Sequence, residues 1–231
     1  YMGQLAEVIK KAGIEENTLV IFTSDNGCSP RADFEDLIAK DHNPSANYRG
    51  HKADIFEGGH RVPFIVKWPK EIVGGEVCDQ TICTTDLMAT CAAIANQKLA
   101  DNAGEDSFSI LPLFKNPESK EFNREATVHH SINGSFSIRK GDWKLILCPG
   151  SGGWSYPRPK KDKMDNLPPF QLYNLKDDIG EKNNLYNEKR EIADELKQLL
   201  ADYINNGRST PGPVQENDEA EKWPQISWIN N

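Results

Sequence analysis

The stretch TLVIFTSDNG, residues 18–27, is an apolar run that stops abruptly at an acid, an amide and a glycine. A run this short, rich in β-branched and aromatic residues and closed by a turn signal, predicts a strand buried on both faces in a parallel sheet. Open α/β sheets bind their ligands at the carboxyl ends of such strands. Asp25 and Asn26 are therefore candidate site residues.

A second stretch, RGHKADIFEGGHRVP at residues 49–63, gathers cations, acids, three glycines and two histidines. Glycine at this density allows positive φ angles or a close approach of the backbone to a ligand, neither of which a core strand needs. The apolar segment that follows predicts a second strand over residues 62–68. We therefore expect residues 49–61 to form part of a site.

Taken together, the two stretches resemble the second half of the catalytic domain of the type I sulfatases, the formylglycine-dependent sulfuric ester hydrolases. The resemblance implies the alkaline-phosphatase-like sulfatase fold, an α/β fold, of which this chain would hold the C-terminal part of the large domain. It extends less specifically over YNL at residues 173–175 and GRSTPGP at residues 207–213. The motifs that match in order and spacing are TSDNG (residues 23–27), RGHK (49–52), EGG (57–59) and RVP (61–63).

The resemblance implies roles for three residues. Asp25 and Asn26 match the pair that coordinates a single divalent cation, usually Ca²⁺, although these hard oxygen ligands also suit Mg²⁺. Lys52 matches the catalytic lysine that contacts the sulfate ester oxygens and neutralises developing charge. The alternatives without a catalytic role are an Asx turn at the end of a strand for Asp25 and Asn26, and a solvated surface lysine for Lys52. Because two ligands do not fill a shell of about six or more oxygens, further ligands must come from elsewhere.

Four histidines are candidates for substrate binding. His51 and His60 flank the expected site, where packing or hydrogen bonding is the alternative role. His129 and His130 precede the turn SING at residues 131–134, and the resemblance implies that the C-terminal subdomain lends residues to the substrate pocket. A place at a strand edge is the alternative for this pair. The basic loop around residues 158–163 is either a solvated charge run or a contact for an anionic saccharide.

The nucleophile of the family has no counterpart in these residues. Cys28-Ser29-Pro30-Arg31 superficially resembles the modification signature that yields formylglycine, but its spacing is one residue short and it follows the wrong strand. We therefore expect the formylglycine, the first acidic metal ligands and the remaining active-site Lys and His residues upstream of Tyr1. On that basis we expect the 231-residue chain alone to be inactive.

Composition is that of a soluble globular protein, with 37% hydrophobic and 27% charged residues. The formal net charge of −8 argues against a nucleic-acid partner, because binding phosphates takes a basic surface. It does not exclude an anionic substrate, since a local cluster of cations can reverse the field in a cleft. From these residues we expect neither a membrane-spanning segment nor a signal peptide, and the resemblance implies a periplasmic or extracellular location.

The five cysteines are odd in number and lack paired metal spacing, so we expect mainly free thiols. Cys78 and Cys83 are the candidate disulfide.

The periodicity of apolar residues divides the chain near residue 120. Residues 1–120 have an α/β pattern, the C-terminal part of the catalytic domain. Residues 121–231 form a small α+β subdomain with an antiparallel sheet, one packed helix and a surface tail. In the first part we expect a helix over 2–12 that Gly13 ends, a short helix over 33–40 and a helix over 84–96. The last of these is capped by Thr85 or Asp86, and its buried stripe is Leu87, Met88, Cys91 and Ile94. In the second part we expect a hairpin of 136–138 with 143–147, a strand over 172–175 and a helix over 188–206 closed by Gly207.

The sequence thus predicts a sulfuric ester hydrolase acting on a sulfated carbohydrate or an aryl sulfate. Two alternatives stay open. One is a phosphodiesterase or phosphonate hydrolase of the same superfamily, and the other is a non-catalytic saccharide-binding remnant.

Overall fold

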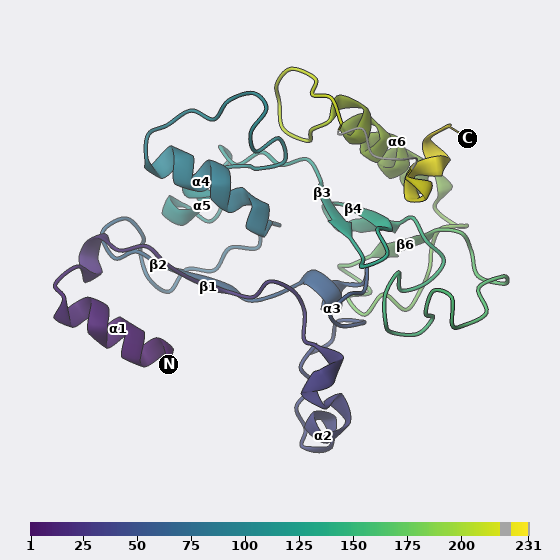
Figure 1. The fold of residues 1–231 in the computed structure, drawn as a ribbon, viewed down its shortest axis with the longest axis horizontal. Coiled ribbons are helices and arrows are strands. Elements are labelled where there is room, and N and C mark those ends of the chain that lie inside the picture. Colours follow the sequence, from purple (N-terminus) through teal and green to yellow (C-terminus); the bar gives the residue numbers. More distant parts are fainter. Residues whose placement is uncertain (218–222, 231) are drawn as a thin grey trace. The chain divides into compact units, whose positions relative to one another are not determined.

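The computed structural model describes residues 1–217 and 223–230, which form two compact units (Figure 1). The first unit comprises Tyr1–Ser24 and Pro63–Arg124, and the second comprises Asp25–Val62 and Glu125–Asn231. The chain passes from the first unit to the second after Arg124, and the domain boundary near residue 120 stays a prediction. Residues 25–62, which the sequence assigns to the first domain, lie with the second unit. The glycine-rich stretch and the C-terminal sheet therefore belong to one unit.

The first unit contains one long helix, two strands and two shorter helices. The N-terminal helix ends just before Gly13, as predicted, because its amphipathic repeat stops there. The elements of the unit are α1 (Met2–Lys11), β1 (Val20–Thr23), β2 (Phe64–Lys67), α4 (Leu87–Ile94) and α5 (Leu111–Lys115), with 3₁₀ turns at Glu15–Asn17 and Thr84–Asp86.

Strands β1 and β2 pair antiparallel, with Val20 opposite Lys67 and Thr23 opposite Phe64. The prediction of a parallel strand buried on both faces is wrong for the described residues. Phe22 and Ile65, which are cross-strand partners, are 44% and 61% exposed. An apolar run shows that a strand could be covered on both faces, but the connection between strands decides their direction, and the run does not encode it.

The helix predicted over residues 84–96 begins differently from the prediction. The segment opens with the 3₁₀ turn Thr84–Asp86, and Asp86, one of the two predicted caps, stands at the N-cap position of α4, which begins at Leu87. Its buried side chain makes no capping hydrogen bond to α4 and instead accepts the Cys83 N–H at 2.8 Å. Asp86 also pairs with Arg124, whose side chain is nearly buried. Met88 and Cys91 are exposed, so the predicted apolar stripe is only partly covered by the described residues.

The second unit is built on a four-stranded antiparallel sheet in the order β3-β4-β5-β6. The predicted hairpin, the third strand and the helix closed by Gly207, whose φ is +61°, are all confirmed. The sequence did not predict the edge strand β3. The sheet strands are β3 (Thr127–His130), β4 (Phe136–Lys140), β5 (Trp143–Ile146) and β6 (Gln171–Asn174), and the helices are α2 (Phe34–Ala39), α3 (Glu57–His60) and α6 (Arg190–Asn206), with 3₁₀ turns at Pro30–Ala32 and Pro224–Asn230.

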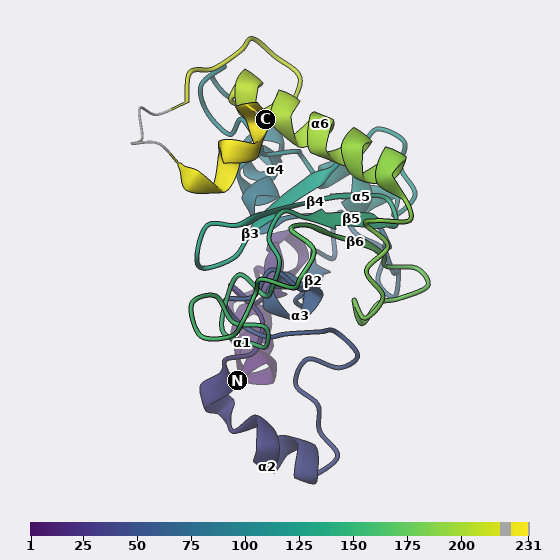
Figure 2. The same cartoon turned by 90° about the vertical axis from the view of Figure 1, so that its right-hand side faces the viewer.

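The two faces of this sheet have different partners (Figure 2). Helix α6 covers one face, where Leu145 and Leu172 pack with Leu196 and Leu200. Ile55 and Phe56, just before α3, pack on the other face against Ile146, Cys148, Tyr173 and Leu175. Because side chains alternate along a strand, β5 sends Leu145 toward α6 and its neighbours Lys144 and Ile146 toward α3.

The predicted surface tail, residues 208–231, is described except for residues 218–222 and 231. The final 3₁₀ turn of the tail does not lie on the surface alone. Trp228 in this turn is 8% exposed and belongs to the hydrophobic core beside α6. The tail therefore contributes to the second unit's core.

All five cysteines are among the described residues and all are free. The Cys78–Cys83 disulfide is therefore wrong for this structure, in which Cys78 is exposed and its thiol lies 3.3 Å from the Pro117 carbonyl oxygen. Among the residues that the structure describes, no helix is both long enough and apolar enough to span a membrane.

Candidate functional site

The loop that carries Asp25 and Asn26 lies against the glycine-rich stretch. The Gly27 N–H donates to the Gly59 carbonyl oxygen at 2.9 Å, and the Lys52 N–H donates to the Cys28 carbonyl oxygen at 3.0 Å. The backbones approach so closely that a Cβ atom on Gly27 would collide with the Gly58 carbonyl group. Glycine is required at position 27 for this reason. The backbone just after Asp25 and Asn26 thus lies against the backbone at Lys52 and Gly59.

The donor set of Asp25 and Asn26 suits a hard divalent cation, because both side chains offer oxygen atoms. Asp25 is exposed and Asn26 is half-buried. Within the described ranges, no group of three or more His, Cys, Asp or Glu side chains could hold a metal ion. The pair therefore fits as part of a ligand shell and does not form a complete one.

Asp54 fixes the turn that presents Lys52. Its carboxylate is 2% exposed, and Oδ2 accepts the His51 N–H at 2.8 Å. On the other side, Oδ1 accepts the N–H groups of Trp154 at 2.7 Å and Ser155 at 3.0 Å. A carboxylate that receives three backbone N–H groups holds its turn firmly, because each of these hydrogen bonds is charge-assisted.

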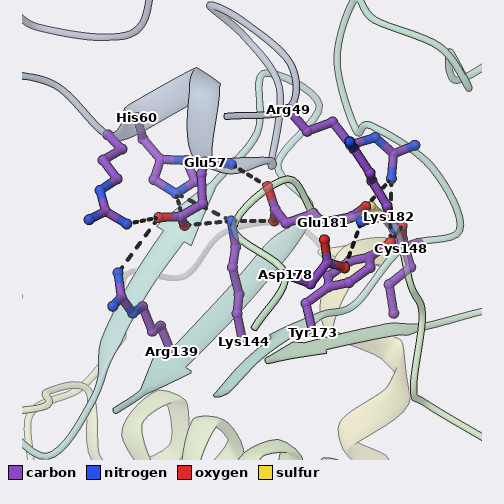
Figure 3. A network of polar contacts seen from close by, with 12 residues as sticks. Arg49, Glu57, His60, Arg139, Lys144, Cys148, Tyr173, Asp178, Glu181 and Lys182 are labelled. Atoms are coloured by element: carbon purple, nitrogen blue, oxygen red, sulfur yellow. Dashed lines mark hydrogen bonds and ion pairs between the residues drawn. The ribbon is translucent and has the colours of Figure 1, made fainter. Parts of the chain in front are cut away.

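A buried ionic network lies beneath α3 (Figure 3). Lys144, fully buried on β5, has its Nζ atom 2.9 Å from Oε1 of Glu57 and 2.9 Å from Oε1 of Glu181. The Glu181 contact is an ion pair without hydrogen-bond geometry. Arg61 and Arg139 approach the second oxygen of Glu57 at 3.4 and 3.6 Å. Two carboxylates therefore share three cations.

The pKa values of the two carboxylates in this network shift in opposite directions. Burial disfavours the charge of Glu57, but Lys144 and the hydrogen bond with His60 outweigh burial and hold the pKa of Glu57 well below its usual range. Burial raises the pKa of Glu181, and Lys144 offsets only part of this effect. Glu57 is thus the firmly ionised partner of the buried lysine.

The same network anchors the backbone of α3 at its start. Glu181 Oε2 accepts the Glu57 N–H at 2.7 Å, and the Glu181 carbonyl oxygen accepts Arg49 Nη1 at 2.8 Å. The Arg49 guanidinium lies 3.8 Å from the centre of the Phe56 ring, and the Arg49 carbonyl oxygen accepts the Gly58 N–H at 2.8 Å. The segment that contains Lys52 is therefore fixed at both ends.

Two of the predicted histidines belong to this network. The rings of His60 and His129 stack with their centres 4.0 Å apart, and His60 Nε2 lies 3.3 Å from Glu57 Oε1. Burial, assisted by the charge of Lys144, lowers the pKa of His60 to about 4 despite the attraction of Glu57. Burial likewise places the pKa of His129 well below its usual value. Both rings are neutral at neutral pH, and the Nδ1 atom of each is buried without a hydrogen-bond partner.

The other two histidines lie elsewhere in the second unit. His51 is part of the Lys52 turn, with Nδ1 3.0 Å from the Lys52 carbonyl oxygen and 3.4 Å from Asp54 Oδ2. His130 is exposed at the end of β3 and packs on Phe136, with ring centres 4.1 Å apart. The structure thus places His51 beside the candidate site and His130 at a sheet edge.

Sequence reasoning missed Lys144, Glu181 and Asp54. A lysine between Trp143 and Leu145 in a predicted strand was a usable signal, because strands rarely bury an unpaired cation. Its partners could not be identified, since Glu57 lies 87 positions away from Lys144 and 124 positions away from Glu181.

Two family models match the chain. The model described as Sulfatase matches residues 1–97, and the model described as N-sulphoglucosamine sulphohydrolase, C-terminal, matches residues 51–206. A curated N-acetylgalactosamine-6-O-sulfatase of Bacteroides thetaiotaomicron is 31% identical over 202 residues, which are 86% of this chain and 39% of that protein. Human arylsulfatase A is 31% identical over 212 residues, which are 86% of this chain and 40% of that protein. The chain thus spans about two fifths of the length of these relatives.

Solved structures share the fold. One, from work on the metabolism of multiple glycosaminoglycans by Bacteroides thetaiotaomicron, matches with a TM-score of 0.74 and 32% identity, covering 87% of this chain and 41% of that one. Another, a protein named Ps i-CgsB solved in complex with a neocarrahexaose, has a TM-score of 0.66 at 24% identity, covering 92% of this chain and 42% of that one. The second likeness concerns the fold alone.

Proposed function

The chain belongs to the sulfatase family, and from this premise we propose that the protein hydrolyses the sulfate esters of saccharides. Family membership confirms the resemblance and the fold class predicted from the sequence. The observation that supports the function best is the backbone pairing of residues 27–28 with Lys52 and Gly59. We infer that this pairing keeps the loop of Asp25 and Asn26 beside the turn that carries Lys52.

In this proposal, Asp25 and Asn26 hold a divalent cation, Ca²⁺ or Mg²⁺, together with ligands from outside the chain. The bound cation supplies positive charge that orients a sulfate group and stabilises its oxygens. Lys52 places its ammonium on the same sulfate oxygens. Because Asp54 fixes the turn on both sides of Lys52, the charge needs little rearrangement when the sulfate arrives, which favours transition-state stabilisation.

The attacking group in this proposal is a formylglycine that lies outside the 231 residues. Accordingly, the chain by itself binds parts of the substrate but does not turn over sulfate esters. The name of one relative, an N-acetylgalactosamine-6-O-sulfatase, supports a sulfated saccharide as the substrate, whereas the name of another, arylsulfatase A, keeps an aryl sulfate as the second candidate. We place the protein in the periplasm or outside the cell, where such saccharides occur.

The test is an assay of sulfate release from 6-O-sulfated N-acetylgalactosamine by the longest protein that carries this chain. Lys52→Ala and Asp25→Ala should each lower kcat/KM by about 100- to 1,000-fold, because each removes a fixed charge or ligand at the reacting group. Lys40→Ala is the matched control, since the Lys40 side chain is 69% exposed and pairs with Asp36 at the surface. Turnover of a phosphodiester in preference to the sulfate ester would overturn the proposal in favour of a phosphodiesterase.

A further inference from the structure

Three segments of the second unit meet at the residues next to Lys52. The Ala53 carbonyl oxygen accepts the Ile132 N–H at 3.0 Å, and Asp54 Oδ1 accepts the Trp154 N–H at 2.7 Å. The turn after β3 and the long loop after β5 are therefore both fastened within two positions of Lys52.

Part of the long loop after β5 is a small closed loop, residues 151–157, which we call the aromatic loop. Its ends meet because the Ser151 N–H donates to the Pro157 carbonyl oxygen at 2.9 Å, and the Ser151 carbonyl oxygen accepts the Ile55 N–H at 2.8 Å. Gly153 lies so close to Ala53 that a Cβ atom would collide with the Ala53 carbonyl oxygen. The backbone of the aromatic loop is thus fixed directly on the Lys52 turn.

The backbone of the aromatic loop is fixed, but its large side chains are exposed to solvent. Trp154 is 45% exposed and Tyr156 is 72% exposed, and Ile132 on the adjoining turn is 60% exposed. Leaving large apolar side chains in water forgoes the stabilisation that their burial would give. Exposed apolar side chains gathered around a charged group are typical of ligand-binding surfaces.

We propose that Trp154 and Tyr156 form a saccharide subsite beside Lys52 that binds the pyranose ring next to the sulfated unit. This inference rests on the proposed function for the placement of the sulfated unit. Trp and Tyr rings have apolar faces that cover the C–H face of a pyranose, and a polar tip that suits its hydroxyl groups. In this proposal, a saccharide that continues from a sulfate held by Lys52 reaches the aromatic loop, because Asp54, two positions from Lys52, accepts the Trp154 N–H.

The test measures saccharide affinity by calorimetry with the full chain and three probes. These are 6-O-sulfated N-acetylgalactosamine, a tetrasaccharide that carries the same unit, and that tetrasaccharide after desulfation. Wild type should bind the sulfated tetrasaccharide roughly tenfold more tightly than the monosaccharide, as expected for one or two ring contacts. Trp154→Ala and Tyr156→Ala should bring this ratio close to one, and Trp154→Phe should keep most of it.

Phe22→Ala is the control, because Phe22 is 44% exposed, like Trp154, but belongs to the first unit. An unchanged ratio in Trp154→Ala, or no binding of either tetrasaccharide by wild type, would overturn the subsite. Failure of the proposed function looks different: desulfation and Lys52→Ala would then leave the affinity for the tetrasaccharide unaltered. Circular dichroism of each variant shows that the fold is retained.

Discussion

Lys144 carries a full positive charge in a place that water does not reach. Removing a charge from water costs several kcal/mol, and the cost is recovered only when partners are close and well placed. The two carboxylates at 2.9 Å meet that condition. Lys144 is therefore a structural residue whose loss leaves Glu57 and Glu181 buried together without their shared cation.

We expect Lys144→Met to lower the free energy of unfolding by about 3–5 kcal/mol, because it strands buried charge. Adding Glu181→Gln should recover part of this loss, since the glutamine carbonyl oxygen can still accept the Glu57 N–H. Lys140→Met is the control: Lys140 pairs with Glu125 and Glu195 at the surface, and such pairs contribute less than about 1 kcal/mol. Urea denaturation measures all three. Equal stability of the Lys144 and Lys140 variants would show that the buried pair contributes nothing.

Residue types close to a motif could be predicted from the sequence, but residue partnerships across the chain could not. Asp25 and Asn26 were candidates because they end a short apolar run, and the role of Lys52 came from the resemblance of its motif to that of the sulfatases. The partners of Lys144 come from two separate segments, α3 and the loop that contains Glu181, and no local pattern records which segments pack together. The roles assigned to the three predicted residues are still predictions.

The turn at Gly27 contacts α3, and this contact joins the two parts of the candidate site. This contact depends on the absence of a side chain, because the Gly27 and Gly58 backbones touch. Its position was predictable only as a glycine-rich region. Elements with local signals, such as α6 and the β4–β5 hairpin, followed their predictions, whereas the direction of β1 relative to β2 depended on a connection that no periodicity encodes.

We expect Gly27→Ala to displace the loop that carries Asp25 and Asn26, because the new methyl group would occupy the space of the Gly58 carbonyl oxygen. Hydrogen exchange of the Lys52 N–H, and of the N–H at position 27, should become faster, because these groups donate across the contact, and the affinity for Ca²⁺ of the longest protein carrying the chain should fall. Gly3→Ala is the control, because nothing lies within 4 Å of its added Cβ and alanine favours a helix by about 0.5–1 kcal/mol. Unchanged exchange in Gly27→Ala would contradict the proposed contact.

For the molecule as a whole, the buried histidine pair makes the stability of the second unit depend on pH. The pKa of His60 is lowered from 6.5 to about 4, so below about pH 6.5 the unfolded chain binds a proton that the folded chain does not. The free energy of unfolding therefore falls as pH drops from 6.5 toward 4, by about 1.4 kcal/mol per pKa unit at most. Glu57 adds to the loss below about pH 4.5, whereas Glu181, whose pKa is raised, takes up a proton in the folded chain above pH 4.5 and opposes the loss there.

Urea denaturation between pH 7 and pH 4 measures this dependence. His60→Phe combined with His129→Phe keeps two stacked rings but removes both titrations, so the slope of stability with pH should become shallower. The groups that face His60 are Lys144, Glu57, Arg139 and His129, and the first three are retained in this variant. His42→Gln is the control because His42 is exposed. A double variant with the wild-type slope would place the pH dependence elsewhere.

The attachment of the aromatic loop also bears on how such a protein could diversify. Asp54 holds the loop through the backbone N–H groups of Trp154 and Ser155, and every amino acid except proline has such a group. The side chains at positions 154 and 156 can therefore change without releasing the anchor, provided that Gly153 is kept. A library randomised at these two positions would vary the surface beside Lys52 while the charged residues beneath stay in place. Mutation can thus alter saccharide preference independently of the residues proposed for catalysis.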